Sequence, residues 1–154
     1  MGSDKSGSSD DPWWYQNRQR KIRINDGAVR AFLRRVSDDL ARGREVAVVV
    51  ASDETVRRAN REFRGKAGST DVLSFVDDEP GRLGDILISA GRAKRQSDEF
   101  GHATTDEIKT LILHGFLHLL GYDHETDQGR MRRRENQLQR KYGLATTLTG
   151  RAAS

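Results

Sequence analysis

The alternation of hydrophobic and polar residues predicts that the chain begins with a strand, a helix and a second strand. Between residues 20 and 25, Ile22 and Ile24 alternate with two basic residues, which is the pattern of a half-buried strand. From Asp26, a possible N-cap, to Gly43, apolar residues recur at helical spacing. The branched run 46–50 predicts a strand covered on both faces. A helix between two such strands predicts a right-handed parallel crossover.

The middle of the chain predicts a second helix followed by two paired strands. Ser52 is placed to cap the helix, and Gly65 to end it. Strands are expected over 72–75 and 83–88. Because the segment between them, 77–82, has the composition of a turn, we expect the two strands to be antiparallel neighbours.

Three helices are expected in the last third of the chain. Ser89 can start a short helix that ends at Gly101, and Thr104-x-x-Glu107 reads as a capping box that opens the next one. That helix is apolar nearly all round, which predicts that it is buried at the centre of the fold. The apolar residues of the final helix keep helical spacing up to a closing glycine, and they are Met131, Leu138 and Tyr142.

These elements predict an α+β fold, a small mixed four-stranded sheet with helices around it and one central buried helix. The length of 154 residues suits a single domain with a modest core. We expect that domain to span 12–143, between a disordered leader over 1–11 and a disordered tail over 144–154.

Composition narrows the class of protein. The net charge of +4 permits a nucleic-acid partner without establishing one. The chain has no cysteine, so it cannot form disulfides, and no apolar run approaches the roughly 18 residues of a membrane helix. With no signal-like segment either, we expect a cytoplasmic protein without a membrane partner.

The central helix carries the strongest chemical signal, a cluster of three of the chain's four histidines. His114 and His118 are four residues apart, so both rings lie on one face of a helix. Gly121 can end the helix and turn the chain back, which would bring His124 to the same point from a loop. Three imidazoles suit one zinc ion per chain and leave a fourth position open, as in catalytic sites.

Two other interpretations of this helix stay open. A histidine on an apolar face is usually a core residue whose ring nitrogens are satisfied by neighbours. The spacing also occurs in the zinc protease pattern H-E-x-x-H-x-x-G-x-x-H. In this chain Gly115 replaces the glutamate that acts as general base in those proteases, which counts against a metallopeptidase. Hydrolysis itself remains possible, since a zinc ion held by three imidazoles lowers the pKa of its water to about 7.

Two further features have a structural and a functional interpretation. His102 has no partner at metal-binding spacing, so we expect it on the surface. The aromatic residues 13–15 could stack on unpaired bases, but they are more simply explained as a flap that packs onto the body of the protein.

Three segments together resemble one known family. HGFLHLLGYDH, FRGKAGSTDVLSF and GDILIS are similar to motifs of the YbeY-type bacterial endoribonucleases. The resemblance runs from about Ile22 to about Tyr142. Ser69 and Val76 stand where the family tends to have prolines.

The resemblance implies roles for individual residues. Arg64 matches the arginine that these enzymes are thought to use in catalysis, and a guanidinium can offset charge that builds on phosphoryl oxygens. His114 is both a predicted zinc ligand and a predicted catalytic residue. Lys66 is a candidate phosphate contact. Asp123, next to His124, is a candidate for orienting a ligating imidazole.

The implied function is a zinc-dependent endoribonuclease that cuts single-stranded RNA. Its expected substrates are rRNA precursors, through maturation of the 3′ end of 16S rRNA, and its expected setting is late ribosome quality control. The ribosome or ribosomal proteins are then partners, and DNA is not. The alternatives are a metallopeptidase-like hydrolase and a non-catalytic ribosome-assembly factor whose zinc braces the fold.

Overall fold

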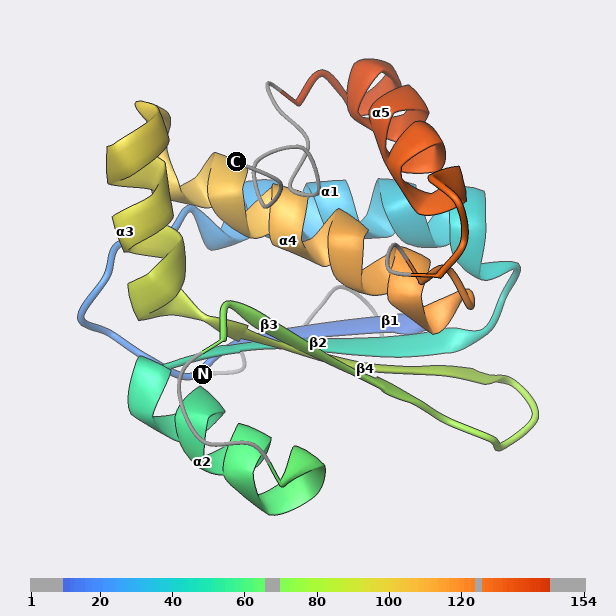
Figure 1. Cartoon of the computed structure of the whole chain (residues 1–154), viewed down its shortest axis with the longest axis horizontal. Coiled ribbons are helices and arrows are strands. Elements are labelled where there is room, and N and C mark those ends of the chain that lie inside the picture. Colours follow the sequence, from blue (N-terminus) through green and yellow to red (C-terminus); the bar gives the residue numbers. More distant parts are fainter. Residues whose placement is uncertain (1–9, 66–69, 124–125, 145–154) are drawn as a thin grey trace.

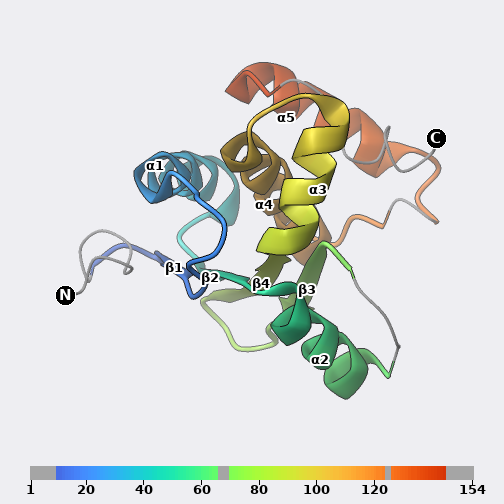
Figure 2. The ribbon, with the colours of Figure 1, turned by 90° about the vertical axis from the view of Figure 1, so that its left-hand side faces the viewer.

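The computed structural model describes residues 10–65, 70–123 and 126–144. It contains one mixed four-stranded sheet with helices on both faces, as Figures 1 and 2 show. The strands are β1 (Trp13–Asn17), β2 (Glu45–Ala51), β3 (Val72–Val76) and β4 (Arg82–Ser89). The helices are α1 (Asp26–Val36), which continues into the π-helical turn η1 (Ser37–Ala41), α2 (Asp53–Arg64), α3 (Ala90–Phe100), α4 (Thr104–Leu119) and α5 (Arg130–Tyr142).

The sheet has the order β1-β2-β4-β3, which makes β1 and β3 its edges. Strands β1, β2 and β4 are parallel, and β3 is antiparallel to β4. The predicted antiparallel pair and the predicted α+β class are both confirmed. Among the described helices, α2 alone covers one face, whereas α1, α3 and α4 lie on the other and α5 packs over α4 (Figures 1 and 2).

The first strand lies earlier in the chain than predicted. Residues 18–25 form no strand; β1 is the aromatic segment, in which Trp13 and Tyr15 are buried and pair with β2. The hydroxyl of Tyr15 donates a hydrogen bond of 2.7 Å to Asp26, which fixes β1 to the start of α1. Residues 20–25 alternate and residues 13–15 are three consecutive aromatic residues, but the aromatic rings bury more apolar surface. Two of the three rings are therefore core side chains and do not face an unpaired base.

Helix α4 is the buried centre of the molecule, as its apolar surface predicted. It packs against the sheet through β3 and β4 and against α1, α3 and α5 (Figure 2). The predicted capping box is wrong: the N-cap is Ala103, which makes no side-chain cap hydrogen bond, and Glu107 is fully buried. The side chain of Glu107 points into the protein and contacts Nε2 of His102, so it does not cap the start of α4.

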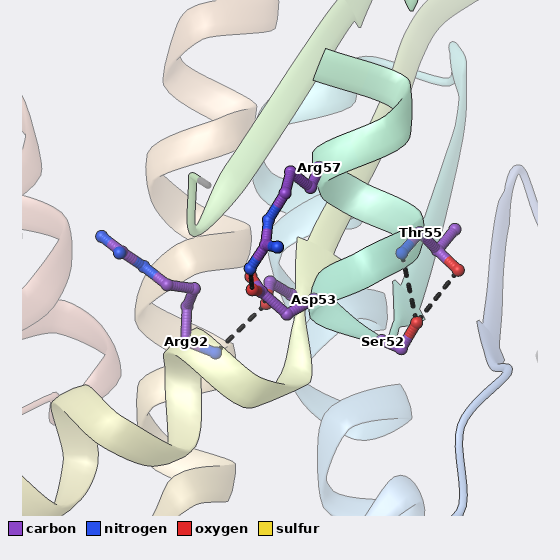
Figure 3. Close-up of polar contacts among 6 residues, drawn as sticks. Ser52, Asp53, Thr55, Arg57 and Arg92 are labelled. Atoms are coloured by element: carbon purple, nitrogen blue, oxygen red, sulfur yellow. Dashed lines mark hydrogen bonds and ion pairs between the residues drawn. The ribbon is translucent and has the colours of Figure 1, made fainter. Parts of the chain in front are cut away.

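Helices α2 and α3 are joined at their first turns by a polar cluster, drawn in Figure 3. Ser52 and Ser89 are the N-caps of these helices, as predicted. The hydroxyl of Ser89 accepts from the amide of Arg92 at 3.1 Å and donates to Asp53 at 3.0 Å, and Asp53 also pairs with Arg57 at 2.7 Å. The cluster connects the helix beneath the sheet to the layer above it.

In the described part of the chain, no helix is both long and apolar enough to cross a membrane.

Candidate metal centre and active site

The C-terminal half of α4 brings the first two predicted ligands together. The rings of His114 and His118 meet edge to face, with 4.7 Å between their centroids. Their Nε2 atoms lie 3.1 Å apart. The four-residue spacing therefore makes the two imidazoles converge, as predicted.

Each ring is held through its other nitrogen, Nδ1. The Nδ1 of His118 lies 3.1 Å from the carbonyl oxygen of Tyr122, and that of His114 lies 3.1 Å from Oε2 of Glu135, which is fully buried. A carbonyl or a carboxylate oxygen can only accept, so Nδ1 is the donor in both contacts. In the neutral rings, Nε2 is then the unprotonated atom of both histidines.

This arrangement suits a cation. Two nitrogen lone pairs 3.1 Å apart repel each other unless a proton or a metal ion lies between them. Two nitrogens bound tetrahedrally to zinc at 2.0–2.1 Å are about 3.3 Å apart, close to the observed separation. A carboxylate or carbonyl behind each imidazole is also the usual support of zinc-binding histidines. The residues present therefore fit the predicted zinc ion.

The turn after α4 explains how His118 acquires its support. Gly121 has a φ of +100°, its amide donates to the carbonyl of His118, and the amide of Tyr122 donates to that of Leu117, both at 3.0 Å. This pair of bonds is a Schellman motif, which needs a residue with positive φ at the position of Gly121. The prediction that Gly121 ends the helix is confirmed, and the motif brings the Tyr122 carbonyl back to the His118 ring.

The third predicted ligand, His124, lies outside the described residues, as does Lys66. Among the residues that are described, no group of three His, Cys, Asp or Glu side chains could hold a metal ion. Asp123 is exposed, and its carbonyl accepts from the amides of Thr126 and Asp127. The roles of His124, Lys66 and Asp123 remain predictions.

Arg64, the predicted catalytic guanidinium, is the last residue of α2. Its Nη2 donates to the carbonyl of Ser74 in edge strand β3 at 2.6 Å. The hydroxyl of Ser74 donates in turn to the carbonyl of Gly115 at 3.4 Å. Because Gly115 follows His114 in α4, one strand separates the guanidinium from the histidine helix.

Gly115 is fixed by packing against the sheet. A Cβ added at this position would lie 2.9 Å from Cγ2 of Ile86 in β4, closer than carbon atoms pack. The position therefore faces the sheet, and a longer side chain would be driven into β4. The glutamate of the zinc protease pattern has no room in this fold.

Sequence reasoning missed Glu135. Glu135 lies in α5, 21 residues after His114, and most of the polar residues of that helix are basic. One signal was present: Glu135 follows Met131 by four residues and precedes Leu138 by three, so it lies on the apolar stripe. An acid on a buried stripe requires a partner inside the protein.

His102 is not the surface residue that was expected. Its side chain is only 17% exposed, and its Nε2 lies 2.7 Å from Oε1 of the fully buried Glu107. The pair lies at the opposite end of α4 from His114 and His118. The predicted absence of His102 from the ligand cluster is consistent with this position.

Comparison with known proteins gives the family. A family model described as endoribonuclease YbeY matches residues 14–143, which include all the described helices and nearly all of the described sheet. The chain belongs to the endoribonuclease YbeY family. Its relatives include the endoribonuclease YbeY of Solibacter usitatus, 48% identical over 82% of this chain and 86% of that protein. The endoribonuclease YbeY of Nautilia profundicola is 46% identical over 71% of this chain and 81% of that protein.

A solved structure supports the same fold. The solution structure of TM1509 from Thermotoga maritima matches with a TM-score of 0.57 at 24% identity, over 79% of this chain and 83% of that chain. The three sequence motifs resemble the same family, so the family predicted from the sequence is confirmed.

Proposed function

We propose that this protein is a zinc-dependent endoribonuclease that cuts single-stranded RNA. The observation that carries the proposal is the pair of Nε2 atoms 3.1 Å apart, each on a ring held through Nδ1, in a member of the endoribonuclease YbeY family. Its substrates are rRNA precursors, with the 3′ end of 16S rRNA as the processed site. It works in late ribosome maturation and quality control, with the ribosome as partner. The family motifs support this assignment.

Three histidines hold the metal in this proposal, namely His114, His118 and His124. When bound, zinc supplies Lewis acidity toward water and toward a phosphoryl oxygen. Glu135 and the Tyr122 carbonyl hold the protons of the first two rings on Nδ1, so that Nε2 faces the ion. Buried Glu135 would also offset the positive charge of the bound ion.

Arg64 acts on the substrate. Charge builds on the non-bridging oxygens when a phosphodiester is cut, and a fixed guanidinium stabilises it. The Ser74 carbonyl accepts a hydrogen bond from Nη2 of Arg64 and so orients the guanidinium at the edge of β3. The other N–H groups of Arg64 are then the donors to the phosphate.

The position of Gly115 argues against a peptidase. A glutamate base at that position would point at Ile86 and not at the two Nε2 atoms. The chain therefore relies on its metal and on Arg64 instead of a general base beside the first ligand.

The test compares Arg64→Ala with Arg58→Ala, an exposed arginine of the same helix that pairs with Glu54. Both variants should keep their zinc content and melting temperature. Arg64→Ala should lose about 100-fold or more in cleavage of a single-stranded rRNA fragment, since loss of one charge-stabilising donor typically costs that much. Arg58→Ala should cut normally.

Three outcomes would contradict the proposal. Equal cleavage by Arg64→Ala and the unmodified protein would remove Arg64 from the mechanism. Cleavage of a generic peptide mixture in place of RNA would indicate a metallopeptidase. A zinc-loaded protein that cuts neither substrate would indicate an assembly factor.

A further inference from the structure

The C-terminal turn of α2 presents an aromatic ring to solvent. Phe63 is 71% exposed, the highest value among the large hydrophobic residues of the described chain. Its ring meets Phe75 of β3 edge to face, with 6.0 Å between centroids. Phe75 in turn packs against the small apolar cluster beneath the sheet. The exposed ring is thus supported from behind by a fixed one.

The same turn carries positive charge. Arg61 and Arg64 are both exposed, and the guanidinium of Arg64 lies 5.6 Å from the centre of the Phe75 ring. Within the part of the chain that the structure describes, neither arginine forms an ion pair. The first two turns of α2 differ, because there Arg57 and Arg58 pair with Asp53 and Glu54, one turn earlier; Figure 3 shows the Arg57 contact.

This surface lies on the other side of β3 from the histidines. Successive side chains of a strand point to opposite faces. Ser74 contacts Gly115 of the histidine helix, whereas Phe75 contacts α2. A chain that passes over β3, which is an edge strand of the described sheet, can therefore touch Phe63 on one face and approach His114 and His118 on the other, with Arg64 at the edge between them.

We propose that Phe63 is a stacking platform for one unpaired base of the RNA substrate, a few nucleotides from the bond that is cut. Arg61 contacts a phosphate beside that base, and Arg64 stays at the phosphodiester that is cut. The inference rests on the proposed function for the nature of the substrate, and it adds a binding subsite that the metal centre does not contain.

Charge and chemistry favour RNA over a protein partner at this surface. Arginine beside an exposed aromatic ring is the combination that holds single-stranded nucleic acids, since every base has a face to stack and every linkage has a charge. In a duplex the faces of the bases are already stacked on their neighbours. The platform therefore also supplies a physical reason for a preference for single strands.

Two substitutions of Phe63 test the platform. Phe63→Leu removes the aromatic face and should weaken binding of a short labelled single-stranded RNA about tenfold, as expected for the loss of one stacked base. In cleavage assays the loss should appear in KM, with kcat little changed. Phe63→Trp keeps an aromatic face and should restore binding.

Phe100 provides a matched control. It is a phenylalanine at 43% exposure at the end of α3, away from β3 and α2 (Figure 1). Phe100→Leu removes a ring from the surface without touching the platform, so RNA binding and KM should not change. Melting temperatures of all three variants should stay near that of the unmodified protein, because the new side chains are also apolar and both positions are partly exposed.

An abasic scan separates stacking from general attraction. One abasic site is moved along the labelled RNA, and affinity is measured by fluorescence anisotropy at low temperature, with intact RNA verified on a gel. One register should weaken binding to the unmodified protein about tenfold and have little further effect on Phe63→Leu. Independent effects in every register would overturn the platform.

The outcomes distinguish this inference from the proposed function. If Phe63→Leu binds and cuts RNA normally, the platform is wrong while the nuclease stands, and the exposed ring then serves a protein partner. If the protein binds RNA through Phe63 but cuts none, the nuclease is wrong while the platform stands.

Discussion

A histidine–glutamate pair lies near each end of α4, but the two pairs differ in which ring nitrogen makes the contact. At each end a histidine contacts a fully buried glutamate, His102 with Glu107 at the start and His114 with Glu135 near the end. His102 uses Nε2 for this contact, whereas His114 uses Nδ1. Only His114 therefore directs its Nε2 at a second histidine.

A buried histidine–glutamate pair is therefore not enough to direct a ring nitrogen at a second histidine. His114 differs from His102 because its glutamate contacts Nδ1, which leaves Nε2 to face the second histidine. At His102 the polar pair satisfies a buried carboxylate, and at His114 it also leaves Nε2 facing the Nε2 of His118.

The largest expected effect comes from replacing His114 and His102 in two separate variants and comparing them. His114→Ala should lose zinc and RNA cleavage, since a site with one ligand fewer binds poorly. His102→Ala should keep both and lose about 1–3 kcal/mol of stability, because buried Glu107 loses a partner. Elemental analysis, an RNA assay and thermal melts measure these outcomes. Unchanged zinc content in His114→Ala would refute the assigned ligand.

Replacing the two glutamates sharpens the comparison. Glu135→Gln should lower zinc affinity or activity about 10- to 100-fold, the usual effect of losing the carboxylate behind a ligating imidazole. Glu107→Gln makes the same chemical change at the other end of α4 and should leave zinc affinity unaltered. Competition with a zinc chelator measures both. Equal losses in the two variants would mean that the effect spreads through the fold.

A third test concerns the packing of α4 beside His114. Gly115→Ala should lower the free energy of unfolding by about 1–3 kcal/mol, because the added methyl would meet Ile86. The control is Gly91→Ala in α3, where the added carbon meets nothing closer than 3.4 Å, so stability should stay the same or rise slightly. Denaturant unfolding compares the two. Equal stability changes would show that α4 has room at Gly115.

The smallest expected effect lies at the far end of α5, the helix that carries Glu135. The hydroxyl of Tyr142 donates to Asp39 at 2.8 Å and is the main reason why the pKa of Asp39 lies below its ordinary 3.8. Burial, followed by this bond, raises the pKa of Tyr142. Tyr142→Phe should cost about 1 kcal/mol at neutral pH with zinc affinity unchanged.

The pH dependence of this variant follows from the sign of the shift. Since the native pKa of Asp39 is lowered, its contribution to stability is present above pH 3.8 and is lost as the pH falls through the native pKa. The difference between Tyr142→Phe and the unmodified protein should therefore shrink in acid. Melts from pH 7 to about pH 3 test this; a constant difference would contradict it.

The sequence by itself determined the features that depend on neighbours along the chain. The spacing of His114 and His118 follows from helix geometry, and Gly121, Ser52 and Ser89 mark helix ends through local hydrogen bonds. Three of the four strands were also found from local apolar patterns. The first was misplaced, because residues 20–25 show the alternating pattern of a strand and residues 13–17 do not, and only pairing with β2 selects the aromatic segment.

Only the tertiary structure decided which distant residues meet at the site. Glu135 reaches His114 from another helix, Gly115 is required by the approach of Ile86, and Arg64 is oriented by a carbonyl of β3. These contacts depend on how helices and strands pack, and the period of a single element records only which of its faces is buried and not what that face will touch.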